Sequence, residues 1–203
     1  MEIIKYTTRS LVENVYIVKE NDNCFIVDPG YGVEYIKEII EENKVIPKFI
    51  ILTHGHGDHI GSVKELKNIY NIPVYAHEKE KELLNNPVLN LSSSMYEDIS
   101  IDADYYIKEG DLLEFENHTL KIIHTPGHTK GGICILLEKD LFTGDTLFAN
   151  SIGRSDLPTG NYNELLESIN NKLMNLDDDI VIHPGHNSDT TIGQERISNP
   201  FIS

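Results

Sequence analysis

The sequence predicts an α+β protein in which two β-sheets pack together and the helices lie on their outer faces. Short apolar runs that are typical of strands recur in both halves of the chain, and only a few segments have helical spacing. No linker-like shift in composition separates the halves, so we expect one domain over residues 1–203. A chain of 203 residues is long enough to bury a substantial core between such layers.

The first half of the chain begins with three strands and then alternates helices with strands. Apolar residues three or four positions apart, such as Val33, Ile36 and Ile40, indicate a helix with one buried face. The turn at 28–30, Asp-Pro-Gly, ends the third strand before that helix. We expect strands at 3–6, 15–18, 24–27, 49–52 and 73–76, helices at 33–43 and 63–70, and a charged helix at 77–84.

The second half repeats this style with more strands and fewer helices. Between the halves, residues 85–104 contain Pro87 and three consecutive serines and show no regular pattern. A loop of this length is usually either a functional cover or a flexible insertion, and the sequence leaves both interpretations open. Strands are expected at 105–107, 112–115, 119–124, 133–137, 140–142 and 180–182, with a helix at 161–174 and a short tail at the end.

The composition argues against several kinds of partner. With 33 acidic and 17 basic residues the formal charge is −16, which repels nucleic-acid phosphates and anionic membranes. No apolar run is long enough to cross a bilayer, and the first residues lack the pattern of a signal peptide. Cys24 and Cys134 stand alone in apolar surroundings and are expected to be buried thiols. We therefore expect a cytoplasmic protein without nucleic-acid or membrane partners.

The clearest chemical signal is the segment 53–59, which reads Thr-His-Gly-His-Gly-Asp-His. It follows directly after an apolar run, so the motif begins where a core strand ends. The glycines at 55 and 57 allow backbone conformations that aim neighbouring side chains at one point. Neutral imidazole and carboxylate groups are ligands for zinc and similar ions. The segment is therefore predicted to bind metal.

Three further segments have the same character as this motif. His128, Asp145 and His186 each follow a predicted strand, and each lies on a turn that contains glycine. Several strand ends can meet at one rim of a sheet, so these side chains are expected to converge. Each segment alone is a weak signal, but their joint occurrence in this order is specific.

With these residues the sequence resembles the metallo-β-lactamase superfamily, whose pattern is Thr-His-x-His-x-Asp-His followed by a His, an Asp and a His. Within that family the chain is most similar to the short glyoxalase II-type hydrolases, through the segments 144–148, 153–158 and 190–201. The resemblance covers essentially the whole chain. It implies an αββα sandwich of two packed mixed β-sheets with helices on the outer faces and metals at one edge.

The resemblance also implies two divalent metal ions, with zinc the first expectation and iron or manganese the alternatives. Many true β-lactamases carry Cys at the bridging position, so the Asp found here argues against antibiotic hydrolysis. By position, the implied ligands are His54, His56 and His128 for the first ion, Asp58, His59 and His186 for the second, and Asp145 as the bridge between them.

The implied function is that of a binuclear metallohydrolase, acting on a small-molecule thioester of the S-lactoylglutathione type as a monomer or homodimer. Two cations about 3.5–4 Å apart share a water and lower its pKa towards about 7, which supplies hydroxide at neutral pH. The metals also stabilise the oxyanion and the departing thiolate. Asp145, as the bridge, and Asp58, as a local proton acceptor, are the predicted catalytic residues.

Four residues are candidates for contact with the substrate. Arg154 lies in a polar loop soon after Asp145, and its guanidinium fork suits a carboxylate. A structural pair between Arg154 and Asp156 explains the same residues equally well. Tyr162, Asn187 and Tyr96 are weaker candidates for the wall of the pocket.

The other polar residues near these motifs are expected to support the structure rather than to bind metal directly. Asp28 is expected either to cap its turn or to orient a metal ligand. The threonines at 53 and 129 are expected to bond backbone or ligands. A structural or surface role is expected for His77, His118, His124 and His183, of which the last two could also orient a ligand.

Alternatives to the glutathione thioester stay open at this point. Longer glyoxalase II enzymes carry a C-terminal helical extension with basic residues for glutathione, and this chain stops at Ser203. Another thiol carrier, or another small ester or lactone, is therefore an alternative. The segment 153–156 is also similar to persulfide dioxygenases, which use one iron and oxygen. A phosphodiesterase is disfavoured because no basic patch is present.

Overall fold

The computed structural model describes residues 1–202. The chain forms two compact units. The first comprises Met1–Ala76 and Lys81–Tyr106, and the second comprises His77–Glu80 and the chain from Ile107 onward. Each unit is organised on its own six-stranded sheet with mixed strand directions. That the whole chain is one domain stays a prediction.

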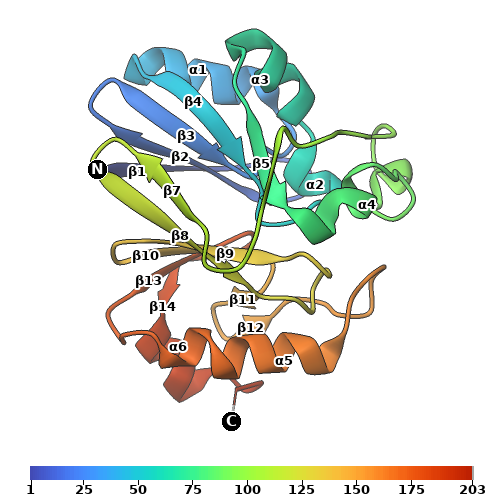
Figure 1. The fold of residues 1–203 in the computed structure, drawn as a ribbon, viewed down its shortest axis with the longest axis vertical. Coiled ribbons are helices and arrows are strands. Elements are labelled where there is room, and N and C mark those ends of the chain that lie inside the picture. The colour runs from blue at the N-terminus through green and yellow to red at the C-terminus, as the bar shows by residue number, and fades with distance from the viewer. Residues whose placement is uncertain (203) are drawn as a thin grey trace. The chain divides into compact units, whose positions relative to one another are not determined.

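The sheet of the first unit follows the order of the chain, from β1 to β6 (Figure 1). β1, β2 and β3 pair antiparallel, whereas β3, β4 and β5 pair parallel. Parallel neighbours need a crossover, which helices provide here. The elements are β1 (Glu2–Thr7), β2 (Asn14–Glu20), β3 (Asn23–Val27), α1 (Val33–Asn43), β4 (Ile46–Ile51), α2 (Gly57–Ile60), α3 (Val63–Tyr70), β5 (Val74–His77) and β6 (Tyr105–Ile107).

The core of the first unit lies where α1 and α3 cover one face of this sheet. The apolar faces that the spacing predicts are the buried ones: Ile36 of α1 and Leu66 of α3 are fully buried against Ile17, Ile26 and Ile50 of the strands. On the charged faces of the same helices, Glu and Lys side chains meet solvent. The predicted helices at 33–43 and 63–70 are therefore confirmed.

The sheet of the second unit has the order β14-β13-β10-β9-β8-β7, and a separate pair of short strands, β11 and β12, follows Asp145. β10 and β13 are its parallel neighbours, with α5 in the connection between them. The elements are β7 (Leu112–Phe115), β8 (His118–His124), β9 (Ile133–Leu137), β10 (Asp140–Gly144), β11 (Leu147–Phe148), β12 (Ser151–Ile152), α5 (Tyr162–Asn171), β13 (Val181–Pro184), β14 (Thr190–Thr191) and α6 (Ile192–Ser198).

The core of the second unit packs α5 and α6 onto its sheet. Leu165 and Ile169 of α5 and Ile192 of α6 are fully buried with Leu141 and Ile182 of the strands. The start of α5 is fixed by the Asn161 side chain, which accepts hydrogen bonds from the backbone N–H groups of residues 163 and 164.

The cysteines behave as the sequence predicts. Cys24 and Cys134 are free thiols and both are completely buried, one in each unit. Burial raises the pKa of Cys24 to about 12 and the pKa of Cys134 to about 11. Both groups therefore stay protonated at neutral pH and fill the core as small apolar side chains.

Sequence reasoning missed three short strands, the short helix α2 and the last helix, and it predicted a single helix at two places where the chain forms two pieces. The expected tail contains β14 and α6, where a buried polar group adds to the apolar contact of Ile192. Glu195 of α6 is fully buried and accepts hydrogen bonds from Asn150 N, Thr190 Oγ1 and Asn199 Nδ2. The expected charged helix is two short pieces, η1 (Glu78–Glu80) and α4 (Lys81–Leu84). The helix at 161–174 ends at Asn171, and η3 (Leu173–Asn175) follows.

Among residues 1–202, no helix is both long and apolar enough to cross a membrane.

Leu66→Ala is expected to lower the free energy of unfolding by about 2–5 kcal/mol, because it leaves a cavity in the core of the first unit. Ile69→Ala on the same helix is the matched control, since Ile69 is 50% exposed and its loss should change that free energy by less than about 1 kcal/mol. Urea unfolding followed by circular dichroism measures both. Equal effects of the two substitutions would contradict the packing described for α3.

Candidate metal centre

The predicted ligands of the first unit follow the carboxyl end of β4. The strand ends at Ile51, and the motif 53–59 turns into α2, which begins at Gly57. His54, His56 and His59 are buried, and Asp58 is partly exposed. The ring of His54 lies 4.9 Å from that of His56 and 4.2 Å from that of His59, measured between centroids. His59 Nε2 is 3.8 Å from Asp58 Oδ2.

Asp28 orients this cluster from the end of the neighbouring strand β3. Its Oδ2 lies 3.0 Å from His59 Nδ1 and accepts a hydrogen bond from the Thr53 hydroxyl. Its Oδ1 accepts a hydrogen bond of 2.7 Å from Thr53 N. The Thr53 hydroxyl oxygen is in turn 3.1 Å from His54 Nδ1. Of the two roles expected for Asp28, the structure shows the orienting one, and Thr53 is part of it.

The predicted ligands of the second unit gather around Asp145. β10 and β13 are parallel neighbours that pair Gly144 with Pro184, and Gly185 N donates to Gly144 O over 2.8 Å. The residues that follow, Asp145 and His186, are therefore brought together. Asp145 Oδ2 is 3.7 Å from His186 Nε2 and 3.6 Å from His128 Nε2.

His128 is held by the loop that follows β12. Its Nδ1 lies 2.7 Å from the carbonyl oxygen of Arg154, which fixes the ring with Nε2 towards Asp145. The preceding Gly127 has a φ of 133°, and a Cβ there would lie 2.1 Å from Leu165 N. Only glycine fits this close approach to α5. The turn and the helix together set the position of His128.

The geometry within each unit fits metal binding. Two ligand atoms at about 2.1 Å from one tetrahedral ion lie about 3.4 Å apart, close to the 3.6–3.8 Å separations found here. His54, His59 and His128 each have Nδ1 beside an oxygen, which leaves Nε2 to carry the lone pair. Ligand atoms of Asp28, His54 and His59 also lie within 4.8 Å of one another. Asp28 is already engaged by Thr53 and His59, so we assign it an orienting role.

Glu80 is a functional candidate that sequence reasoning missed. It is 1% exposed, and its Oε1 accepts hydrogen bonds of 2.7 Å from both Thr129 Oγ1 and Gly131 N. The loop that carries His128 is thereby tied to η1. In the sequence Glu80 is one acid in a charged segment, and no local pattern distinguishes it from its neighbours.

The predicted substrate residues lie on the surface of the second unit. Arg154 forms a bidentate pair with Asp156, with Nε to Oδ1 at 2.9 Å and a terminal nitrogen (Nη2) to Oδ2 at 2.7 Å. Both side chains are about two-thirds exposed, so the structural pair exists and the guanidinium still meets solvent. Tyr162 opens α5 and is 50% exposed, and Asn187 is exposed with a φ of 71°. Contact of these residues with substrate stays a prediction.

The remaining histidines have structural partners. His77 and His124 stack at 4.1 Å, and burial lowers the pKa of both, that of His77 to about 4. His118 Nδ1 lies 2.7 Å from a carboxylate oxygen of Glu138. His183 lies between two carboxylates: its Nε2 is 2.7 Å from Asp140 and its Nδ1 3.3 Å from Asp189. These contacts agree with the structural roles that the sequence predicts.

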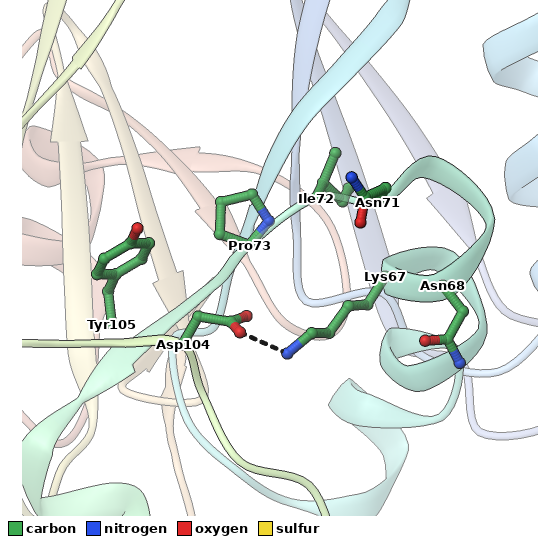
Figure 2. A pocket seen from close by; sticks show the side chains of 7 residues that line it. All are labelled: Lys67, Asn68, Asn71, Ile72, Pro73, Asp104 and Tyr105. Carbon is green, nitrogen blue, oxygen red and sulfur yellow. Dashed lines mark hydrogen bonds and ion pairs between the residues drawn. The ribbon is translucent and has the colours of Figure 1, made fainter.

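An open pocket of about 380 Å³ in the first unit is not part of the metal cluster. Figure 2 shows its lining, with the Lys67 side chain reaching Asp104 over 2.7 Å. Pro73 immediately precedes β5, so the pocket lies at the start of that strand, whereas the His motif follows the end of β4. Ligand sites of parallel sheets lie at the carboxyl ends of the strands, which favours the motif over this pocket.

Comparison with known proteins identifies the family. A sequence model of the metallo-beta-lactamase superfamily matches residues 9–186. The chain belongs to this superfamily. A hydroxyacylglutathione hydrolase of Haemophilus influenzae, GloC, is 38% identical over 211 residues that cover all of this chain and 98% of that protein.

Solved structures of the superfamily are similar over the whole chain. The crystal structure of the BLEG-1 B3 metallo-beta-lactamase has a TM-score of 0.94 and 36% identity, with full coverage of both chains. TTHA1623 in a di-iron-bound form has a TM-score of 0.87 and 30% identity, covering 98% of this chain and 100% of that one. The predicted family and the metallo-β-lactamase fold are confirmed, and the His and Asp clusters are of the type that binds divalent metals in this superfamily.

Asp28→Asn is expected to weaken zinc binding by about 10- to 100-fold, because the His59 imidazole loses the carboxylate that orients it. Asp104→Asn, which removes a carboxylate from the same unit at the other pocket, is the matched control and should leave zinc affinity unchanged. Competition with a chromogenic chelator measures the affinity. Unchanged binding by Asp28→Asn would show that Asp28 only shapes its turn.

His183 is expected to make the stability of the second unit depend on pH. Burial alone would lower the pKa of His183, but the hydrogen bonds to Asp189 and Asp140 outweigh burial, and the net shift is upward. Stabilisation from a raised histidine pKa is fully present below about pH 6.5 and is lost as pH rises through the folded-state value.

The difference in unfolding free energy between wild type and His183→Gln should therefore be larger at pH 6 than at pH 9. Urea titrations of metal-free protein at the two pH values test this expectation. A difference that does not change with pH would mean that folding leaves the pKa of His183 unchanged, which would contradict the upward shift.

Proposed function

We propose that this member of the superfamily is a binuclear metallohydrolase that cleaves a small-molecule thioester. The observation that carries the proposal is the pair of ligand clusters, one in each unit, in which the rings of His54, His59 and His128 are fixed through Nδ1. The similarity to GloC, a hydroxyacylglutathione hydrolase, supports a thioester substrate of the S-lactoylglutathione type. Another acyl-thiol, ester or lactone is the alternative within the same reaction class.

The proposed ligand set uses every predicted position. Zinc is the first expectation, and the di-iron form of TTHA1623 supports iron as an alternative in a related site. The proposed ligands are His54, His56 and His128 for one ion, Asp58, His59 and His186 for the other, and Asp145 as the bridge.

When bound, such a metal pair supplies an acidic water as nucleophile and polarises the substrate carbonyl. The protein's own contribution is to hold the ligands and to accept a proton. Asp28 and the carbonyl of Arg154 hold His59 and His128 in fixed orientations. Asp58, partly exposed beside His59, is the proposed proton acceptor. Thiolate is a good leaving group and needs little acid assistance.

We further propose that Arg154, Tyr162 and Asn187 contact the substrate, Arg154 by exchanging Asp156 for a substrate carboxylate. The pair is exposed and therefore screened by solvent, so the exchange has a small cost. A cytoplasmic monomer or homodimer without nucleic-acid or membrane partners completes the proposal, supported by the net charge of −16.

Two other activities have specific support. The structural similarity to the BLEG-1 enzyme favours a test of β-lactam hydrolysis, against which the Asp at the bridging position argues. The sequence segment 153–156 favours a test of persulfide dioxygenation by a single iron. Metal content of freshly purified protein, with assays of thioester, cephalosporin and persulfide substrates, distinguishes the three. One iron per chain with oxygen uptake would overturn the hydrolase.

Asp145→Ala is expected to reduce bound metal below two ions per chain and to lower kcat/KM for thioester hydrolysis by about 10²–10³-fold, since the bridge and its charge are lost. Asp179→Ala is the matched control because Asp179 is an exposed carboxylate of the same unit that pairs only with Lys139 among the contacts described. Elemental analysis and a free-thiol assay are the measurements. Full activity of Asp145→Ala would refute the bridging assignment.

A further inference from the structure

The segment 85–104 is built against the metal-binding turn of the first unit. Gly57 N, at the start of α2, donates a hydrogen bond of 2.7 Å to Asn90 O. A Cβ at Gly57 would lie 2.9 Å from Met95 Sδ and 2.9 Å from Ser92 Cβ. The segment therefore touches the turn between His56 and Asp58 with no space for another side chain.

Internal hydrogen bonds give this segment a defined shape. Asn90 and Ser92 are fully buried. Asn90 Nδ2 donates to Ile99 O over 2.9 Å, and Ser92 N donates to Asn90 Oδ1 over 3.0 Å. Ser92 Oγ accepts from Ile99 N over 2.8 Å, next to the short helix η2 (Ser92–Ser94). Of the two interpretations that the sequence allows, these contacts favour a functional cover over a flexible insertion.

This cover presents apolar and aromatic side chains beside the metal-binding turn. Tyr96 is 64% exposed and meets Tyr31 edge to face, with ring centroids 5.0 Å apart. Tyr31 packs against the end of α2, since a Cβ at Gly61 would lie 2.8 Å from its ring. Met95, next to Tyr96 in the chain, is partly buried and packs against Gly57 at the start of α2. An aromatic surface that remains half open to solvent is suited to contact with a ligand.

The charge around this surface is negative. Residues 82–107 contain no Lys or Arg, and Glu97 and Asp98 follow Tyr96 directly. Burial raises the pKa of Tyr31, and the nearby carboxylates of Glu97 and Asp58 raise it further. Because Tyr31 contacts Tyr96, an anionic group placed against this ring pair would lie near Glu97 and Asp98 and would be repelled.

We propose that Tyr31, Met95 and Tyr96 form a specificity wall for an uncharged apolar group of the substrate, next to the proposed ligand Asp58. The substrate class is then a thioester with an aromatic or aliphatic group at this position, and an anionic group there is disfavoured. The proposal rests on the hydrolase function proposed above, because the wall is defined relative to that site.

The first experiment compares substrates that differ in one group. N-acetylcysteamine thioesters with acetyl, phenylacetyl and succinyl acyl groups vary the acyl side, and acetyl thioesters of thiophenol and ethanethiol vary the thiol side. Tyr96→Ala should raise KM about 3- to 10-fold for the substrates with an aromatic group on one of these sides, with kcat and metal content unchanged. The acetyl ester of N-acetylcysteamine should change less than about 2-fold, and Tyr96→Phe should behave as wild type.

Tyr105→Ala is the matched control, because Tyr105 is 53% exposed but lies at the pocket near the start of β5 (Figure 2). It should leave every KM unchanged. Glu97→Gln should lower KM for the succinyl thioester, because it removes one of the repelling carboxylates. If Tyr96→Ala changed KM equally for all substrates, or changed no KM, the proposed wall would be refuted. The proposed hydrolase function would not be affected.

A binding measurement keeps the wall testable apart from catalysis. The thioether analogue of the phenylacetyl substrate cannot be hydrolysed, and calorimetry gives its Kd for metal-loaded wild type and Tyr96→Ala. A Kd that rises about 3- to 10-fold in the variant supports the wall even when no thioester is cleaved, in which case only the proposed reaction fails. Equal Kd values refute the wall.

Discussion

The orientation of buried imidazole rings is the constraint on which the candidate site depends. A histidine ligand donates one lone pair, so its other nitrogen must be satisfied and the ring must be turned correctly. In the first unit a single carboxylate does much of this, since Asp28 contacts His59 and, through Thr53, reaches the ring of His54. Asp28 can do so because β3 and β4 are parallel neighbours whose carboxyl ends lie at the same edge of the sheet.

The second unit solves the same problem with different groups. There a backbone carbonyl, that of Arg154, holds His128, and the buried carboxylate of Glu80 holds the loop through Thr129 and Gly131. A buried carboxylate is costly unless several donors satisfy it, and Glu80 has two at 2.7 Å. The cost of burial is therefore offset only when the loop has its native shape. Burial of Glu80 thus favours the native conformation of the loop.

The sequence predicted those features that depend on local pattern. The helices at 33–43 and 63–70 follow from apolar spacing. The metal ligands, which stay a prediction, follow from a motif directly after an apolar strand. Features fixed by polar contacts between distant positions were not predictable. The buried Glu195 that anchors α6, the buried Glu80 and the buried Asn90 all look like surface residues in the sequence. Each of them has a partner 9 to 51 positions away, which no local pattern encodes.

The overall charge of the chain and the local charge at each proposed substrate contact act differently on an anionic substrate. A net charge of −16 would by itself repel an anionic thioester, so recognition of a carboxylate requires a local cation such as Arg154. Its bidentate pairing with Asp156 is exposed and therefore weak, so exchange for a substrate carboxylate is possible there. Residues 82–107, which include Tyr96, contain no Lys or Arg that could pair with a substrate carboxylate in the same way. The two proposed contacts thus differ in kind: Arg154 suits a charged end of a substrate, and the aromatic wall suits a neutral one.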